Sequence, residues 1–122
     1  MEVKKTERGW AGHFCCAERC KFRRNTLLEF NNIKIVVSTV GLMKTLDGKK
    51  YEKVNLHGYF ETMAFYADKE DKRYNDADVE RGVKFESKWY IKKIDADDEA
   101  NEMHETVVKE ISEKLKKGFY CA

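Results

Sequence analysis

The stretch TLLEFNNIKIVVSTV, residues 26–40, sets the fold of this chain. It contains two apolar runs, 26–30 and 33–40, which are separated by the pair Asn31-Asn32. Asparagine tolerates the positive φ angles that a two-residue hairpin turn requires. Apolar side chains recur at alternate positions of the second run, so one face of it is fully apolar and the other is mixed. We therefore predict an antiparallel β-hairpin at this place.

Segments on both sides of the hairpin add to the sheet. Alternating side chains predict further strands at 8–16, 59–67 and 76–85, and a short strand at 89–91. Gly82 inside the run 76–85 indicates a bulge or the close approach of a ligand. Residues 17–24 form a helical turn in this interpretation, and the charged segment 68–74 forms a solvated loop.

A long helix is predicted from Asp97 to Lys117. An apolar stripe runs along it from Ala100 to Leu115, its first residues are acidic, its last residues are lysines, and Gly118 supplies the C-terminal cap. The expected fold is α+β, in one domain spanning residues 1–122. Its antiparallel sheet has five to six strands and one long C-terminal helix, and the pattern leaves room for a short N-terminal helix.

Charge and composition exclude several classes of partner. Lys plus Arg number 24 and Asp plus Glu number 22, so the net charge of +2 gives no general attraction to DNA. The sequence has neither an apolar run of ~18 residues, which a membrane span needs, nor the apolar core of a signal peptide at its start. We expect a cytosolic protein that binds neither DNA nor a membrane.

The cysteines allow two interpretations. A metal site would draw on His13, Cys15 or Cys16, Cys20 and Cys121, but their spacing matches no common structural zinc pattern. We favour free thiols that pack as small apolar residues in a reducing compartment, and we expect no metal and no cofactor.

Several residues have the chemistry to bind an anionic ligand that carries a ring. Trp10 and His13 lie in a segment that also holds arginine and asparagine, a mixture that core packing does not require. Phe85 and Trp89, beside the loop 86–98, are the aromatic residues best placed to stack on a nucleobase. Asn101, in the first turn of the helix, can bind the polar edge of a ligand.

A second group of residues is basic. Arg19, Arg23 and Arg24 are followed directly by Asn25 and Thr26, and these side chains could hold phosphates through bidentate contacts. For an isolated cluster of this kind, a solvated basic turn is the default interpretation.

Acidic residues offer a weaker case for catalysis. Asp76, Asp78 and Glu80 alternate along one predicted strand, and with His104 they could perform acid–base chemistry. We favour a solvent-facing strand for the carboxylates and a surface position on the helix for His104. Since the sequence also holds no catalytic motif, we predict that the protein is not an enzyme.

Six segments together carry a resemblance to a known family. RGWAGHF (8–14), FRRNTLL (22–28), VVSTVG (36–41), ETMAF (61–65), DADV (76–79) and NEMHE (101–105) resemble the phage Thoeris anti-defence type-one family. The resemblance implies a sponge that binds a cyclic ADP-ribose isomer of the glycocyclic type, the signal of TIR-based immunity, without cleaving it. It also implies a homodimer or higher homo-oligomer in the host cytoplasm, and in some members separate sites for cyclic trinucleotides.

Specific roles follow if the resemblance holds. Phe85 would stack on the adenine, Asn101 would bind a polar edge, and Arg81 would lie near a phosphate or ribose, since it is an even number of residues from Phe85 on one predicted strand. The basic group from Arg19 to Thr26 would form the second, phosphate-rich site. Two alternatives are a phage inhibitor that binds a host defence protein directly, and a cyclic nucleotide hydrolase that uses Asp76, Asp78 and His104.

Overall fold

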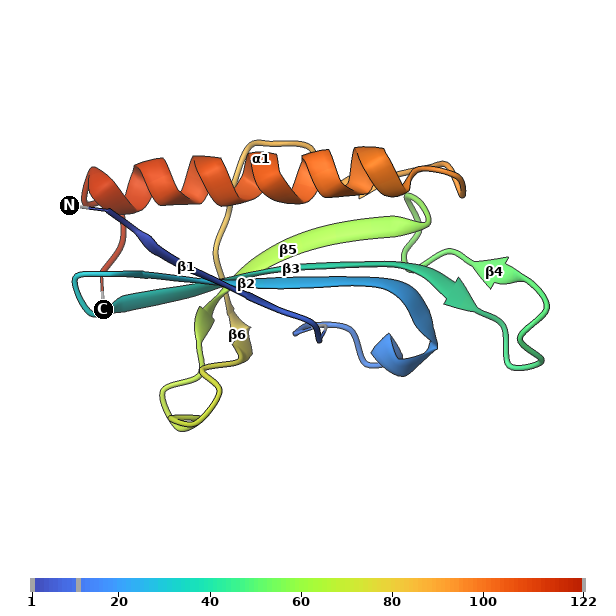
Figure 1. The fold of residues 1–122 in the computed structure, drawn as a ribbon, viewed down its shortest axis with the longest axis horizontal. Coiled ribbons are helices and arrows are strands. Elements are labelled where there is room, and N and C mark those ends of the chain that lie inside the picture. Colours follow the sequence, from blue (N-terminus) through green and yellow to red (C-terminus); the bar gives the residue numbers. More distant parts are fainter. Residues whose placement is uncertain (1, 11, 122) are drawn as a thin grey trace.

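The computed structural model describes residues 2–10 and 12–121, and it confirms the predicted α+β class (Figure 1). One helix, α1 (Asp97–Lys116), lies along one face of an antiparallel sheet. Within these residues the strands are β1 (Lys4–Arg8), β2 (Cys20–Phe30), β3 (Ile33–Lys44), β4 (Tyr51–Glu52), β5 (Phe60–Ala67), β6 (Ala77–Gly82) and β7 (Tyr90–Ile91). Their order is β1-β2-β3-β5-β6, with β4 paired to β3 and β7 paired to β5.

The predicted hairpin is the centre of the sheet. β2 and β3 pair from Phe30↔Ile33 outward, and Asn31 and Asn32 form the turn with φ angles of 49° and 67°. Both angles lie in the left-handed region, where asparagine costs less than most residues. The prediction for this segment is confirmed.

The main core lies between the sheet and α1. Leu28, Ile35 and Val37 of the hairpin pack with Val107 and Ile111 of the helix, and all five side chains are fully buried. The predicted apolar stripe from Ala100 to Leu115 is buried as expected. Gly118 has a φ of 77° after the end of the helix, which is the conformation that a glycine C-cap supplies.

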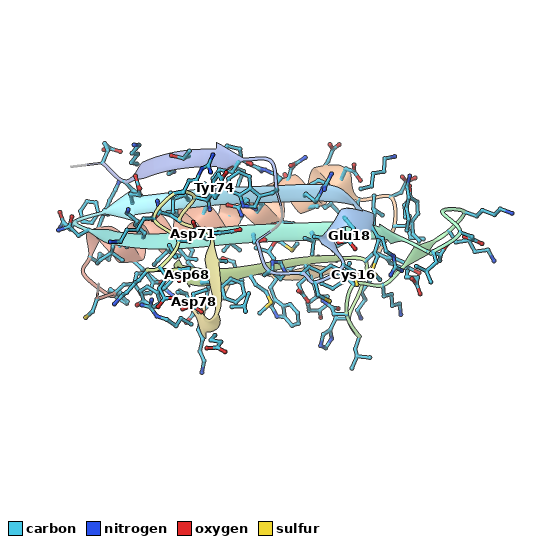
Figure 2. The ribbon with its side chains drawn as sticks, turned by 90° about the horizontal axis from the view of Figure 1, so that it is seen from below. Cys16, Glu18, Asp68, Asp71, Tyr74 and Asp78 are labelled. Atoms are coloured by element: carbon cyan, nitrogen blue, oxygen red, sulfur yellow. The ribbon has the colours of Figure 1, made fainter. Side chains whose placement is uncertain are left out.

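The opposite face of the sheet is covered by loops. Figure 2 looks onto this face, where the segment that carries Asp68, Asp71 and Tyr74 crosses over the strands. Small apolar clusters lie on this side of the sheet, and one of them consists of Leu27, Val36 and Ala67. The loops therefore help to bury most of the mixed face of β3, including Val36 and Ser38, whereas Lys34 at the start of the strand is exposed.

Two predictions for the N-terminal part are wrong. The strand expected at 8–16 lies earlier, at Lys4–Arg8, because β1 pairs with β2 only as far as Asn25 and the chain then folds back over the sheet in bends. Ala11 of that segment lies outside the described residues. The helical turn expected at 17–24 is limited to Ala17–Arg19, since the following residues extend β2 along β3 as far as the pair Cys20↔Met43.

Two further differences concern the strand count and β6. β4 is a two-residue strand that the sequence analysis did not predict, so the described residues hold seven strands and not five or six. The strand expected at 76–85 ends at Gly82. Its pairing with β5 is irregular, because residues 78–81 lie between the two pairs Phe65↔Gly82 and Ala67↔Ala77. This irregularity agrees with the bulge that Gly82 indicated.

Within the described part of the chain, no helix is both long enough and apolar enough to cross a membrane.

Candidate functional site

An apolar groove lies at the edge of the sheet where the chain passes from β6 to β7. After Gly82 the backbone leaves the sheet: Val83 N–H donates to the Ala64 carbonyl at 2.8 Å, and the chain returns where Thr62 N–H donates to the Trp89 carbonyl at 2.7 Å. The segment 83–89 between these bonds forms one side of the groove. The other side is β5, which contributes residues 61–64 to the groove.

The segment 83–89 is held in place by α1. The Glu110 carboxylate accepts hydrogen bonds from the backbone N–H groups of Glu86 and Ser87, at 2.8 and 2.9 Å, and from the Ser87 hydroxyl. Burial opposes the charge on Glu110, but these bonds and the contact with Lys114 outweigh it and lower the pKa to about 2. The groove therefore has a fixed wall, which a preformed binding site requires.

The groove has a volume of about 520 Å³ and is mostly apolar. Phe85 and Trp89 both line it, as does the exposed side chain of Met63. Trp89 is braced by two neighbours, the His57 ring at 5.0 Å and the Tyr90 ring at 4.9 Å between centroids. The two aromatic residues that the sequence analysis chose for stacking thus share one hollow. The remaining lining residues are Glu61, Thr62, Ala64, Gly82, Val83 and Lys84.

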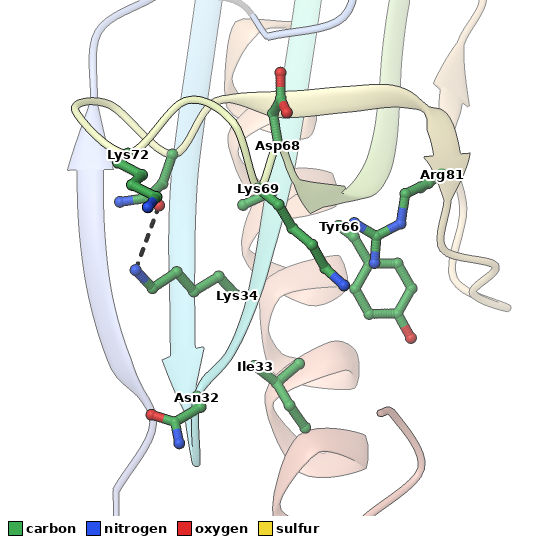
Figure 3. A pocket seen from close by; sticks show the side chains of 10 residues that line it. Asn32, Ile33, Lys34, Tyr66, Asp68, Lys69, Lys72 and Arg81 are labelled. Atoms are coloured by element: carbon green, nitrogen blue, oxygen red, sulfur yellow. Dashed lines mark hydrogen bonds between the residues drawn. The ribbon is translucent and has the colours of Figure 1, made fainter. Parts of the chain in front are cut away.

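Arg81 lies in a different hollow. The irregular pairing of β6 carries its guanidinium over the Tyr66 ring, 4.7 Å from the centroid, in a basic cavity of about 640 Å³ (Figure 3). The expectation that Arg81 and Phe85 project from one strand face is wrong, because β6 ends before Phe85. The cavity and the groove follow each other along β5, which contributes Tyr66 to the first and residues 61–64 to the second.

Asn101 lies away from the groove within one chain. Its amide oxygen accepts a bond from Arg24 of β2 at 3.4 Å, whereas Glu110 marks the side of α1 that faces segment 83–89. A single chain therefore does not bring Phe85 and Asn101 together at one site.

Trp10 and His13 are separated as well. Trp10 is exposed, and its ring meets the Tyr74 ring edge-on at 5.7 Å between centroids. The His13 side chain is only 3% exposed and bonds Ser38 Oγ through Nδ1 at 2.7 Å and Glu61 through Nε2 at 2.9 Å. His13 thus anchors the N-terminal loop to β3 and β5.

The basic group predicted as a phosphate site is dispersed. Arg19 donates to the Lys44 carbonyl and to Glu52, while Arg24 bonds Glu7 and Glu105 at 2.8 Å each. Arg23 is exposed, whereas Asn25 and Thr26 are buried. Successive residues of a strand point to opposite faces, so Arg23 and Arg24 do not converge within one chain.

The residues proposed for hydrolysis do not meet. His104 is fully buried between α1 and the sheet, where its ring bonds Thr26 and Thr39 at 2.7 Å each. The expectation of a surface histidine is wrong. His104, like its neighbour Met103, lies on the side of α1 that faces the sheet, where it bonds polar side chains of β2 and β3. Asp76 bonds Asn25, whose side chain projects from the sheet face opposite to that of Thr26.

The four cysteines are free thiols. Cys20 is buried and packs with Val40 and Val54, and burial raises its pKa to about 11. Cys15, Cys16 and Cys121 are not buried, in contrast to the expected packing. Across residues 2–10 and 12–121, no group of three His, Cys, Asp or Glu side chains is arranged to hold a metal ion.

The residues of the basic cavity were not among the predicted site residues, apart from Arg81. Lys34, Lys69, Lys72 and Tyr66 come from three separate segments, and Lys69 and Lys72 were interpreted as part of a solvated loop. The one available signal was the pair of lysines three residues apart in a loop that follows a strand.

Comparisons with protein-family models, with curated proteins and with solved structures gave no match to this chain.

Proposed function

We propose that this protein binds a cyclic ADP-ribose isomer of the glycocyclic type and sequesters it without cleavage, as a phage anti-defence protein that acts against TIR-based (Thoeris) immunity in the host cytoplasm. The observation that carries the proposal is the shared groove of Phe85 and Trp89. The adenine would lie against these rings, since stacking of a base on an aromatic side chain contributes about 1–3 kcal/mol. Lys84 at the rim of the groove supplies a cation for the phosphates.

The inaccessibility of the nearest catalytic-type side chains supports binding over cleavage. Ser38, His13 and Glu61 form a hydrogen-bonded relay of the kind that activates a hydroxyl group. Ser38 is 0% exposed, so its hydroxyl cannot reach a bound ligand. Glu61 is charged and accepts from His13 and Asn55, and these bonds lower its pKa against the effect of burial.

The proposed sponge is a homo-oligomer if Asn101 contributes to the same ligand site as Phe85. A ligand that contacts both residues needs one of them from each of two chains, as the sequence resemblance to an oligomeric family implies. The proposed site would then lie between subunits, with the groove as one half of it.

The test is recovery of intact ligand. The pure protein is incubated with a cyclic ADP-ribose isomer, freed of unbound ligand and denatured by heat, and the supernatant is analysed by mass spectrometry. Intact ligand near one per chain is the expected result. Phe85→Ala should lose most of it, whereas the matched control Phe119→Ala, an exposed phenylalanine outside the groove, should retain it. A cleaved product, or equal loss in both variants, would refute the proposal.

One observation favours the alternative of an inhibitor that binds a host defence protein. Trp10 and Tyr74 form an exposed pair with Arg8 at 4.8 Å from the first ring and Arg73 at 5.0 Å from the second. Trp, Tyr and Arg are the residues that dominate binding energy in protein interfaces. Under this alternative, Trp10→Ala should abolish protection of phage in host cells, with no ligand recovered from the wild-type protein.

A further inference from the structure

We propose that the basic cavity binds a condensed phosphate, an anion with two or more linked phosphoryl groups, at a site separate from the groove. The cavity lies between the turn of β2 and β3, the end of β5 and the loop 68–76. Its volume of about 640 Å³ falls in the range of small-ligand pockets, roughly 300–1,000 Å³. Its lining includes Lys34 of β3, Tyr66 of β5, Lys69 and Lys72 of the loop, and Arg81 of β6.

The charge of the cavity is strongly unbalanced. Lys34, Lys69, Lys72 and Arg81 contribute four cations, and Asp68 contributes one carboxylate. The Asp68 carboxylate accepts the N–H of Glu70 at 3.0 Å, and Figure 3 shows it directed away from Lys69 and Arg81. Clustered cations repel one another, so an anion of high charge is the ligand that relieves the repulsion.

Three of the four cations are available for a ligand. Lys69, Lys72 and Arg81 form no ion pair with any carboxylate in residues 2–10 and 12–121. The ammonium of Lys34 donates to the Asn75 amide oxygen at 3.3 Å and is 4.0 Å from Glu29. By contrast, Arg19 and Arg24 of the basic group from Arg19 to Thr26 both bond carboxylates of the same chain.

Arg81 is pre-positioned for bidentate binding. Its guanidinium lies over Tyr66, and Tyr66 is itself braced edge-on by Tyr120 at 6.4 Å between centroids. Stacking holds the plane of the guanidinium and leaves its N–H groups free to bind oxygens in pairs. Because Arg81 covers this face of the Tyr66 ring, a nucleobase cannot stack there. The arrangement therefore favours recognition of phosphates over recognition of a base.

The loop that carries Lys69 and Lys72 is held by hydrogen bonds within the loop and from β1. The Asp71 carboxylate accepts from the N–H groups of Tyr74 and Asp76, at 3.1 and 3.3 Å. Arg8 of β1 donates to the carbonyls of Tyr74 and Asn75 from across the sheet. Asn75 has a φ of 51°, and this left-handed residue is held by those bonds at the rim of the cavity. A loop held in place in this way lowers the entropic cost of binding.

Several phosphoryl groups fit this arrangement better than one. The cations come from β3, the loop 68–76 and β6, which lie on different sides of the cavity (Figure 3). A single phosphate reaches one side, whereas a chain of linked phosphates can contact all of them. Free inorganic polyphosphate and the polyphosphate of a nucleotide share this chemistry.

The test measures binding of inorganic triphosphate by calorimetry at low salt, with inorganic phosphate and ATP as the comparison probes. Triphosphate should bind at one site per chain, and inorganic phosphate should bind at least roughly tenfold more weakly, since it loses charge-assisted hydrogen bonds. If ATP and triphosphate bind with equal affinity, the polyphosphate of a nucleotide can be the ligand. If ATP binds more weakly than triphosphate, the ligand is free polyphosphate. Triphosphate that does not bind, or binds no better than phosphate, would overturn the proposal.

Matched variants separate this site from general charge effects and from the groove. Lys69→Gln with Lys72→Gln should weaken triphosphate binding at least roughly tenfold. Lys49→Gln with Lys50→Gln removes the same charge from an exposed loop elsewhere and should change the affinity less than about twofold. Phe85→Ala should leave triphosphate binding unchanged. Equal losses in the two lysine variants, or a loss in Phe85→Ala, would place the ligand elsewhere.

Discussion

Among single residues, the buried polar side chains form hydrogen bonds, with the exception of Ser112, whose hydroxyl has no partner within the described residues. His104 is the clearest case, because it lies in a continuous chain of bonds from Thr62 through Thr39 and the imidazole to Thr26 and then to Glu7. The Glu7 carboxylate can only accept, so Thr26 donates to it and His104 Nε2–H donates to Thr26. Nδ1 of the neutral imidazole then accepts from the Thr39 hydroxyl, so the neutral form of His104 satisfies both bonds. Burial, and secondly the charge of Arg24, lower its pKa to about 4.

The lowered pKa of His104 predicts a loss of stability in acid. As the pH falls from about 6.5 to about 4, His104 becomes protonated in the unfolded chain but stays neutral in the folded protein. The free energy of unfolding therefore decreases over this window, by an amount on the order of 3 kcal/mol. Urea unfolding from pH 7 to pH 4.5 should show this slope. His104→Gln, which does not titrate, should show a clearly smaller slope, and an unchanged slope would contradict the assignment.

Gly41 gives a second prediction for a single residue. A Cβ atom there would lie 2.8 Å from Cε2 of the fully buried Phe60, and closer still to Cδ2, so the two side chains would overlap. Gly41→Ala should therefore lower the free energy of unfolding by about 1–3 kcal/mol through overpacking. Gly9→Ala is the control, because a Cβ atom at Gly9 would have no heavy atom within 4 Å. Thermal unfolding of both variants checks the difference.

Among the elements, long-range bonds fix segments that have little regular structure of their own. Segment 83–89 is held in place by hydrogen bonds to Glu110 of α1. The loop 68–76 is held by hydrogen bonds from Arg8 of β1. The local sequence does not indicate either set of hydrogen bonds, because the bonded residues are 23 or more positions apart along the chain. The walls of the groove and of the cavity are therefore set by tertiary contacts.

The hydrogen bonds between α1 and segment 83–89 can be tested without a ligand. Glu110→Gln removes the charge that accepts the N–H groups of Glu86 and Ser87. Amide hydrogen exchange of both residues should then accelerate at least roughly tenfold, because hydrogen bonds to a charged acceptor contribute about 1.5–3 kcal/mol. Glu113→Gln, at an exposed position on the same helix, should leave both rates unchanged. Equal exchange in the two variants would mean that Glu110 does not hold the segment.

For the molecule as a whole, the proposed ligand site requires assembly. Phe85 and Asn101 are on different sides of α1, so one monomer of 14.4 kDa cannot present both to the same ligand. Two copies can do so, and they generate two equivalent sites.

Subunit mixing tests this assembly. Phe85→Ala and Asn101→Ala alone should each bind a cyclic ADP-ribose isomer weakly. Mixed dimers carry one site with both defects and one intact site, so unfolding and refolding the two variants together should restore part of the binding. Light scattering should give a mass of at least two chains for the wild type. A monomer that binds the ligand at full affinity would contradict this arrangement.

Local sequence patterns were sufficient to predict the hairpin 26–40, the helix from Asp97 and the α+β class. The patterns are alternate apolar positions, left-handed asparagines at a turn, and an apolar stripe with helical spacing. Phe85 and Trp89 were also chosen from sequence, because aromatic residues beside a loop are a local feature.

The sharing of a site by particular side chains, in contrast, is a property of the folded chain. Folding buries His104, pairs Arg24 with Glu7 and Glu105, and carries Arg81 away from Phe85 through the irregular pairing of β6. The basic cavity likewise brings together residues 32–34, 66–75 and 81. Spacing along the chain cannot reveal such contacts, because strand register and long-range hydrogen bonds determine them and both depend on the whole folded sheet.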